Sequence, residues 1–166
     1  MQLIISQVHK LLIQKKKTIA VAESCTGGLA SALFTETSGS SRYFLGAIVA
    51  YNNRIKHSIL KIPSKIIREN GAVSEKVAKA MAESIRKLML SDYGIGITGI
   101  AGPTGAVLHK PVGTVFIAVS DKKTTLCRKF FFKGSRANIR YKTALQSLTL
   151  LKELILDKNR IKEKQI

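Results

Sequence analysis

Five short apolar runs divide this chain, and each has the length of a single β-strand. The first three are residues 18–22 (TIAVA), 43–51 (YFLGAIVAY) and 93–98 (YGIGIT). The last two, residues 113–120 and 125–132, flank the polar turn DKKT and predict an antiparallel hairpin. The fold class then depends on what lies between these strands.

Helix-type patterns occupy most of the intervening segments. Amphipathic stripes predict helices at 2–16, at 74–90 with Ser74 as the N-cap, and from 135 to about 156; shorter helices are expected at 29–34 and 52–60. The side chains expected on buried helix faces are Ile4, Val8, Leu11, Leu12, Val77, Met81, Ile85, Leu88, Ile139, Ala144, Leu148, Leu151 and Ile155. Strands interleaved with helices predict a three-layer α/β/α domain whose mixed, mostly parallel sheet includes an antiparallel hairpin strand.

One domain accounts for nearly the whole chain. A length of 166 residues suits a single core, and no internal repeat or linker divides the sequence. We assign residues 1–157 to this domain and expect a polar basic tail at 158–166.

The charge balance is strongly basic, with 28 Lys and Arg against 10 Asp and Glu and a formal charge of +18. Such a charge attracts polyanions, so a basic nucleic-acid-binding protein is one possible function. The cations are spread along the whole chain, however, and we expect nucleic acid to bind only through nonspecific charge. The most one-sided stretch, 122–142, holds eight cations and no acid and is a candidate anion site.

Cysteine usage and hydropathy point to the cytoplasm. The two cysteines, Cys25 and Cys127, form neither a disulfide framework nor a cluster with metal-ligand spacing, so we expect no metal. No apolar run reaches the length of a membrane span, and we expect no membrane association. The N-terminal charges follow the apolar residues, which is the reverse of a signal peptide.

The stretch AESCTGG, residues 22–28, joins a predicted strand to a predicted helix and carries two possible nucleophiles. Ligands of α/β sheets bind at this end of a strand, where the backbone N–H groups of Cys25, Thr26 and Gly27 are candidate anion donors. The alternative is a helix that is merely capped by Ser24 or Thr26.

Either nucleophile needs a base. Cys25 would need His57 or His109, as in a cysteine–histidine hydrolase. Ser24 would need a neutral Lys56, and burial or nearby cations such as Arg54 must then lower the pKa of that lysine toward 7 or 8.

The segment YNNRIK, residues 51–56, surrounds this lysine with polar side chains. Asn53 lies one helical turn before Lys56 and shares its face, and Tyr51 ends the preceding strand.

Gly94, Gly96 and Gly99 match the spacing of a dinucleotide-binding motif, with Asp121 near the position of a ribose ligand. These glycines lie within the predicted strand and do not open a helix, so we reject that site. The long loop at 99–113, rich in glycine and proline, is expected to be functional.

Taken in order, AESCTGG, YNNRIK, GAVSE, TGIAGP with KPVGTV, and FKGSRANIR resemble the CinA C-terminal domain family. The match covers nearly the whole chain, and we expect it to be a stand-alone member without the extra N-terminal domain of longer members. The resemblance implies an amidohydrolase that converts nicotinamide mononucleotide and water to nicotinate mononucleotide and ammonia, in pyridine nucleotide salvage. The alternative, motivated by the net charge and by the family's historical name, is a basic nucleic-acid-binding or competence-associated protein without amidase activity.

The resemblance also implies a metal-free Ser–Lys mechanism without a cofactor, in a homo-oligomer. Ser24 is then the nucleophile, Lys56 the base, and Tyr51 a third member of the catalytic group. Residues expected to bind the substrate are Cys25, Thr26, Gly27, Asn53, Thr98, Gly99, Gly102, Arg136 and Arg140. Ala106 and Ser135 depart from the family pattern, where glycine and an acidic residue are common, and we expect any effect of these departures to fall on substrate affinity.

Overall fold

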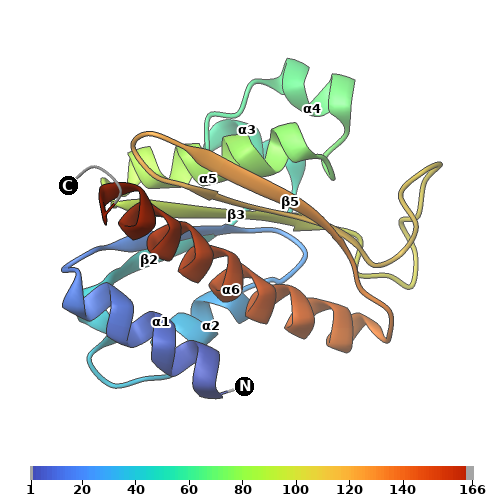
Figure 1. Ribbon diagram of the computed structural model, residues 1–166. Helices are drawn as coiled ribbons and strands as arrows, with labels where there is room; N and C mark the ends of the chain where they lie inside the picture. Colours follow the sequence, from blue (N-terminus) through green and yellow to red (C-terminus); the bar gives the residue numbers. More distant parts are fainter. Residues whose placement is uncertain (1, 164–166) are drawn as a thin grey trace.

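A five-stranded sheet in the order β2-β1-β3-β4-β5 forms the centre of the protein (Figure 1). The computed structural model describes residues 2–163, with side chains from Leu3 to Asp157. The strands are β1 (Ile19–Glu23), β2 (Phe44–Val49), β3 (Tyr93–Gly99), β4 (Thr114–Ser120) and β5 (Thr125–Phe131). β1 pairs in parallel with β2 and β3, whereas β4 is antiparallel to both of its neighbours. The predicted mixed, mostly parallel sheet with its hairpin is therefore confirmed.

Helices cover both faces of this sheet, as Figure 1 shows. One face carries α1 (Gln2–Gln14), α2 (Leu29–Thr35) and α6 (Arg136–Glu163), and the other carries α3 (Asn53–Ser58), α4 (Ser64–Asn70) and α5 (Glu75–Leu88). A short 3-10 turn, Ser40–Arg42, leads into β2. This arrangement confirms the three-layer α/β/α prediction.

Side chains alternate along a strand, so the two faces of the sheet present different residues. In β3, Ile95 and Ile97 pack into the core beneath α1, α2 and α6. Gly94 and Gly96 point the other way, and a Cβ atom at either would lie within 3 Å of α5 atoms. Gly94 and Gly96, two of the three glycines with dinucleotide-motif spacing, thus leave the room that lets α5 pack directly on the sheet.

The order of the strands creates a switch point at β1. From β1 the chain passes through α2 to β2 on one side, and it then returns through α3, α4 and α5 to β3 on the other side. A crevice opens beyond the carboxyl ends of the strands wherever the direction of winding reverses in this way. Ser24, which directly follows β1, lies at this crevice.

Three local features differ from the sequence predictions. The sequence analysis did not predict α4, and α6 extends to Glu163 where a boundary near 156 was expected. The side chain of Leu88, predicted to be buried, is exposed because α5 ends there and the next residue, Met89, packs against the core in its place. The division into a domain at 1–157 and a tail at 158–166 stays a prediction, and residues 164–166 lie outside the described residues.

Substituting Gly96 tests the close packing of α5 on β3. We expect Gly96→Ala to lower the free energy of unfolding by about 3 kcal/mol, because the new Cβ would lie 2.8 Å from the Met81 Cβ and closer still to the α5 backbone. Urea denaturation measures the change. Lys76→Ala, on the exposed side of α5, is the control and should change stability by less than about 0.5 kcal/mol. An unchanged midpoint for Gly96→Ala would contradict this packing.

Candidate active site

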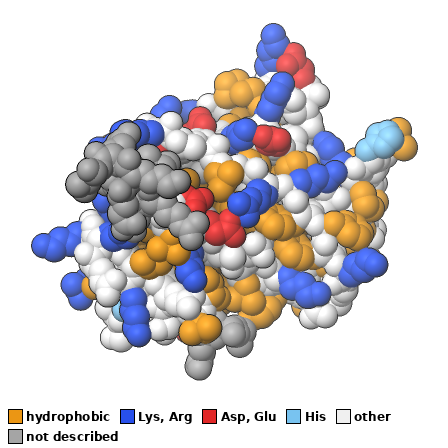
Figure 2. Space-filling model, viewed as in Figure 1, with side chains coloured by type: hydrophobic (Ala, Val, Ile, Leu, Met, Phe, Trp, Pro, Cys, Tyr) orange, Lys and Arg blue, Asp and Glu red, His pale blue; other side chains and the backbone are white. Residues whose placement is uncertain are grey.

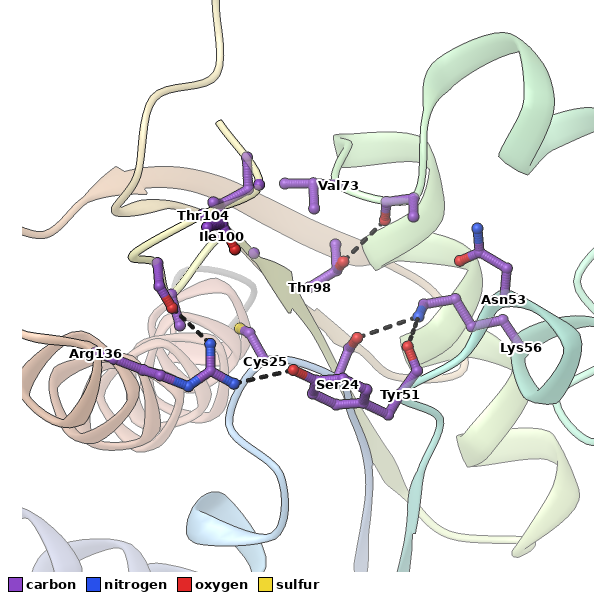
Figure 3. A pocket seen from close by; sticks show the side chains of 15 residues that line it. Ser24, Cys25, Tyr51, Asn53, Lys56, Val73, Thr98, Ile100, Thr104 and Arg136 are labelled. Atoms are coloured by element: carbon purple, nitrogen blue, oxygen red, sulfur yellow. Dashed lines mark hydrogen bonds between the residues drawn. The ribbon is translucent and has the colours of Figure 1, made fainter. Parts of the chain in front are cut away.

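A pocket of about 340 Å³ lies where the parallel strands end (Figure 3). Its walls come from the residue pair after β1, from Tyr51 and α3, from the α4–α5 connection, from the end of β3 with the loop that follows it, and from the start of α6. Nine residues predicted for the site line this pocket: Ser24, Cys25, Tyr51, Asn53, Lys56, Thr98, Gly99, Gly102 and Arg136.

Lys56 reaches Ser24 from the opposite wall of the pocket, as Figure 3 shows. Its side chain is only 1% exposed, and its Nζ lies 3.1 Å from Ser24 Oγ. The same Nζ donates to the carbonyl oxygens of Ala50 at 2.8 Å and Tyr51 at 3.2 Å. Asn52 begins the helix that carries Lys56, because its side chain accepts a hydrogen bond from the Arg54 N–H.

Burial lowers the pKa of Lys56 from 10.5 to about 8. The two carbonyl oxygens can only accept, so two of the lysine's N–H bonds must point at them. In the neutral amine the remaining position is a lone pair, and it faces the Ser24 hydroxyl. Lys56 can therefore accept the Ser24 proton near neutral pH.

Cys25 is less suited to be the nucleophile. Burial raises the pKa of its thiol to about 12, so the thiolate is scarce at neutral pH. A Cβ at Gly99 would lie 3.1 Å from Cys25 Sγ, which shows that the sulfur packs against this glycine. His57 instead contacts the carbonyl oxygen of Ile62 at 2.9 Å, and His109 lies exposed in the loop after β3. Neither histidine lines the pocket, and the cysteine–histidine alternative is not supported.

The turn from Ser24 to Gly28 uses some of its N–H groups internally. Gly27 N–H donates to the Ser24 carbonyl oxygen, and Gly28 N–H donates to the Glu23 carboxylate. Of the N–H groups that these bonds leave over, that of Cys25 belongs to a residue of the pocket lining and is the turn's candidate donor to a developing oxyanion. The alternative in which Ser24 or Thr26 caps the helix is wrong, because Gly28 is the N-cap of α2.

Arg136 and Tyr51 meet at the rim of the pocket (Figure 3). One Arg136 nitrogen donates to the Tyr51 hydroxyl at 2.9 Å, and the other donates to the Gly102 carbonyl oxygen at 2.7 Å. Tyr51 therefore contacts Lys56 through its backbone carbonyl and Arg136 through its phenol. Both side chains are exposed at the mouth.

Thr98 and Asn53 lie on the side of the pocket next to α5 and α3. The Thr98 hydroxyl donates to the Ala72 carbonyl oxygen at 2.8 Å, which leaves its oxygen able to accept from a ligand. Asn53 is exposed, and its amide lies near Lys56 in Figure 3.

Thr26, Gly27 and Arg140 do not line the pocket, although the sequence analysis placed them among the substrate-binding residues. The Arg140 guanidinium donates twice to the Thr26 carbonyl oxygen, at 2.8 and 3.2 Å. Gly27 has a φ of +60°, and a Cβ there would lie 3.1 Å from Arg140. These residues therefore build the turn behind Ser24.

Glu23 is the site residue that the sequence analysis missed. Its carboxylate is fully buried and binds the first turn of α2. The sequence feature that could have indicated its role is the position of an acidic residue at the end of an apolar strand, where a buried charge needs a specific partner.

The two departures from the family pattern lie outside the pocket lining. Ala106 is exposed in the loop after β3, and the Ser135 hydroxyl accepts a hydrogen bond from the Asn138 N–H at the start of α6. Their effect on affinity stays a prediction.

Among the described side chains, from Leu3 to Asp157, no group of three or more His, Cys, Asp or Glu is placed to hold a metal ion. Over the same residues, no helix has the length and apolar character needed to span a membrane.

The fold and the pocket define a three-layer α/β protein with a serine and a buried lysine at the switch point of its sheet. The chain belongs to the CinA C-terminal domain family, whose model matches residues 1–155.

Individual relatives agree with this assignment. The chain is 46% identical over 149 residues to a CinA-like protein from Syntrophus aciditrophicus, a match that covers 89% of this chain and 36% of that protein. The competence damage-inducible protein A (ComA) from Klebsiella pneumoniae has a similar structure, with a TM-score of 0.88, 27% identity, and coverage of 90% of this chain and 93% of that one. The competence/damage inducible protein CihA from Agrobacterium tumefaciens matches with a TM-score of 0.85, 30% identity, and coverage of 91% and 95% respectively.

Replacing Lys56 should change how stability depends on pH. Because the pKa of Lys56 is lower in the folded protein than in the unfolded chain, the unfolded state binds more protons between about pH 8 and 10.5. Relative to Lys56→Met, the wild type should therefore gain about 2 to 3 kcal/mol of unfolding free energy as the pH rises from 7 to 10. Denaturation of both proteins at several pH values measures this, and parallel pH profiles would contradict it.

Proposed function

We propose that this protein is an amidohydrolase that converts nicotinamide mononucleotide and water to nicotinate mononucleotide and ammonia. The observation that carries the proposal is the contact between Ser24 Oγ and the buried, pKa-lowered Lys56 amine at 3.1 Å. The resemblance of the ordered sequence motifs to nicotinamide-nucleotide amidohydrolases supports the choice of substrate. No cofactor is required for this reaction.

The first half-reaction would acylate the serine. Neutral Lys56 accepts the Ser24 proton while Ser24 Oγ attacks the carboxamide carbon. The carbonyl oxygen of the substrate becomes an oxyanion, and the Cys25 N–H would stabilise it. Lys56 then gives its proton to the leaving nitrogen, so that the C–N bond breaks and ammonia departs.

The second half-reaction would restore the enzyme. Water attacks the ester carbon and gives a proton to Lys56, and the same N–H would stabilise the second oxyanion. Collapse of this intermediate breaks the ester bond, and Lys56 returns the proton to Ser24 Oγ. The products are a free Ser24 hydroxyl and the carboxylic acid, which releases its proton to solvent and becomes the carboxylate.

The electrostatics of the pocket suit an anionic substrate. Lys56 and Arg136 line it, and its described lining includes no Asp or Glu. Arg136 at the mouth is suited to bind the phosphate through a bidentate contact. The net charge of +18 would draw such a substrate toward the protein.

The setting of the enzyme is also part of the proposal. We place it in the cytoplasm, because Cys25 and Cys127 are both free, and we expect a homo-oligomer. Binding of nucleic acid through nonspecific charge stays a prediction. Lys and Arg side chains are scattered over the face shown in Figure 2, and they do not gather there into one stripe.

Three substitutions test the roles of the nucleophile and base. Ser24→Ala and Lys56→Met should each lower ammonia release from nicotinamide mononucleotide by about 10³-fold or more, because each removes a member of a pair that acts as a unit. Cys25→Ala should retain activity within about threefold, since the reaction does not use the thiol. The assay contains a chelator, so that activity without metal is measured directly. An active Ser24→Ala, or an inactive Cys25→Ala that still folds, would overturn the assignment.

The pH profile tests the protonation state of Lys56. Only the neutral amine accepts a proton, so kcat/KM should rise about tenfold per pH unit below the pKa of about 8 and level off above it. The measurement is the initial rate of ammonia release between pH 6 and 9.5. A rate that stays constant from pH 6 to pH 8 would show that Lys56 is not the base.

A further inference from the structure

Glu23 is a buried acid directly before the candidate nucleophile, and its side chain leaves the sheet on the side away from Lys56. The alternation of β1 sends Ile19, Val21 and Glu23 to the face that carries α1, α2 and α6. Ser24, one residue later, turns to Lys56 on the opposite side.

The Glu23 carboxylate ties the strand end to the start of α2. One oxygen accepts the N–H groups of Gly28 at 2.8 Å and Ala30 at 3.2 Å. The other accepts the Ser31 N–H at 2.8 Å and the Ser31 hydroxyl. The carboxylate therefore uses N–H groups of the first helical turn that would otherwise be free.

Arg140 holds the same turn from α6. Its guanidinium donates twice to the Thr26 carbonyl oxygen, while the N–H of that peptide unit, on Gly27, donates to the Ser24 carbonyl oxygen. The Thr26–Gly27 peptide is planar, so bonds at both of its ends fix its orientation.

We propose that Glu23 and Arg140 are positioning residues, which together hold the Ser24–Gly28 turn so that the Ser24 hydroxyl faces Lys56 and the Cys25 N–H is placed to stabilise the oxyanion. Neither residue lines the pocket, so both act through the turn. This inference rests on the proposed function, in which Ser24 is the nucleophile.

Glu23→Gln is the main test. An amide keeps the size of the side chain, but its NH₂ group must face at least one of the N–H donors that the carboxylate accepts. A shift of about 1 Å in a reacting group can cost on the order of 10²-fold in rate. We expect kcat to fall 10- to 100-fold with KM changed less than threefold.

Asp92→Asn is the matched control at the other end of β1. The Asp92 carboxylate accepts hydrogen bonds from the Thr18 N–H, the Thr18 hydroxyl and Lys17. It lies outside the pocket lining, so its loss should lower the unfolding midpoint without lowering kcat. Arg140→Met is the second test variant, in case Glu23→Gln does not fold, and should lower kcat at least tenfold.

A second readout does not depend on nicotinamide mononucleotide. A small alkyl fluorophosphonate reacts with an activated serine: a bond forms between Ser24 Oγ and phosphorus, fluoride leaves, and Lys56 takes the serine proton. Intact-mass spectrometry gives the labelling rate of the wild type, the two test variants, the control and Ser24→Ala. We expect at least tenfold slower labelling of Glu23→Gln and Arg140→Met, an unchanged rate for Asp92→Asn, and none for Ser24→Ala.

The two readouts separate the outcomes. If the wild type labels at Ser24 but does not hydrolyse nicotinamide mononucleotide, the proposed substrate fails, and the labelling rates of the variants still decide the positioning role. Positioning is overturned if folded Glu23→Gln and Arg140→Met react like the wild type, or if Asp92→Asn slows as much as they do. It is also overturned if the wild type shows neither activity, because there is then no activated serine to position.

Discussion

A buried lysine amine with no carboxylate partner among the described side chains is the feature on which this site depends. Burying a cation is costly, and the cost falls when the group loses its proton. The Lys56 amine lies against carbonyl oxygens of Ala50 and Tyr51, which follow the last paired residue of β2, Val49. These oxygens lie beyond the strand ladder, so the end of the strand supplies polar partners without supplying a negative charge. The two carbonyl oxygens thus give the Lys56 amine enough hydrogen-bond partners to be buried. They do not stabilise the ammonium form enough to keep it fully protonated.

The packing of the sheet brings this lysine to the serine. Because Gly94 and Gly96 allow α5 to pack directly on β3, the α3–α5 layer lies close to the strand ends. Lys56, on the short helix α3, then reaches across to Ser24 beyond β1. The switch of winding direction at β1 keeps helices from filling this space. The close packing of α5 on β3 and the open crevice beyond β1 therefore lie next to each other.

Much of the fold could be predicted from the sequence, because strand and helix periods are local signals. The sequence also predicted one site that contains Ser24, Lys56, Tyr51 and Arg136. That prediction rested on the resemblance of motifs more than on physical reasoning. The roles of Glu23 and Arg140 could not be predicted, since they depend on which backbone groups lie within reach after folding. The prediction that Leu88 is buried was wrong for a related reason. Periodicity predicts the buried face of a helix but not the residue at which the helix ends.

The separation of Glu23 from Lys56 follows from the two-residue period of a strand. If Glu23 faced Lys56, the carboxylate would stabilise the ammonium and raise the pKa of the lysine, which would then be a poor base. The alternation of β1 instead directs Glu23 to α2 and Ser24 to Lys56, on opposite faces of the sheet. The helix N–H groups satisfy the buried negative charge where it lies. On one face of the sheet, Glu23 at the end of β1 thereby anchors the Ser24–Gly28 turn. On the other face, no carboxylate from β1 hinders Lys56 from losing its proton.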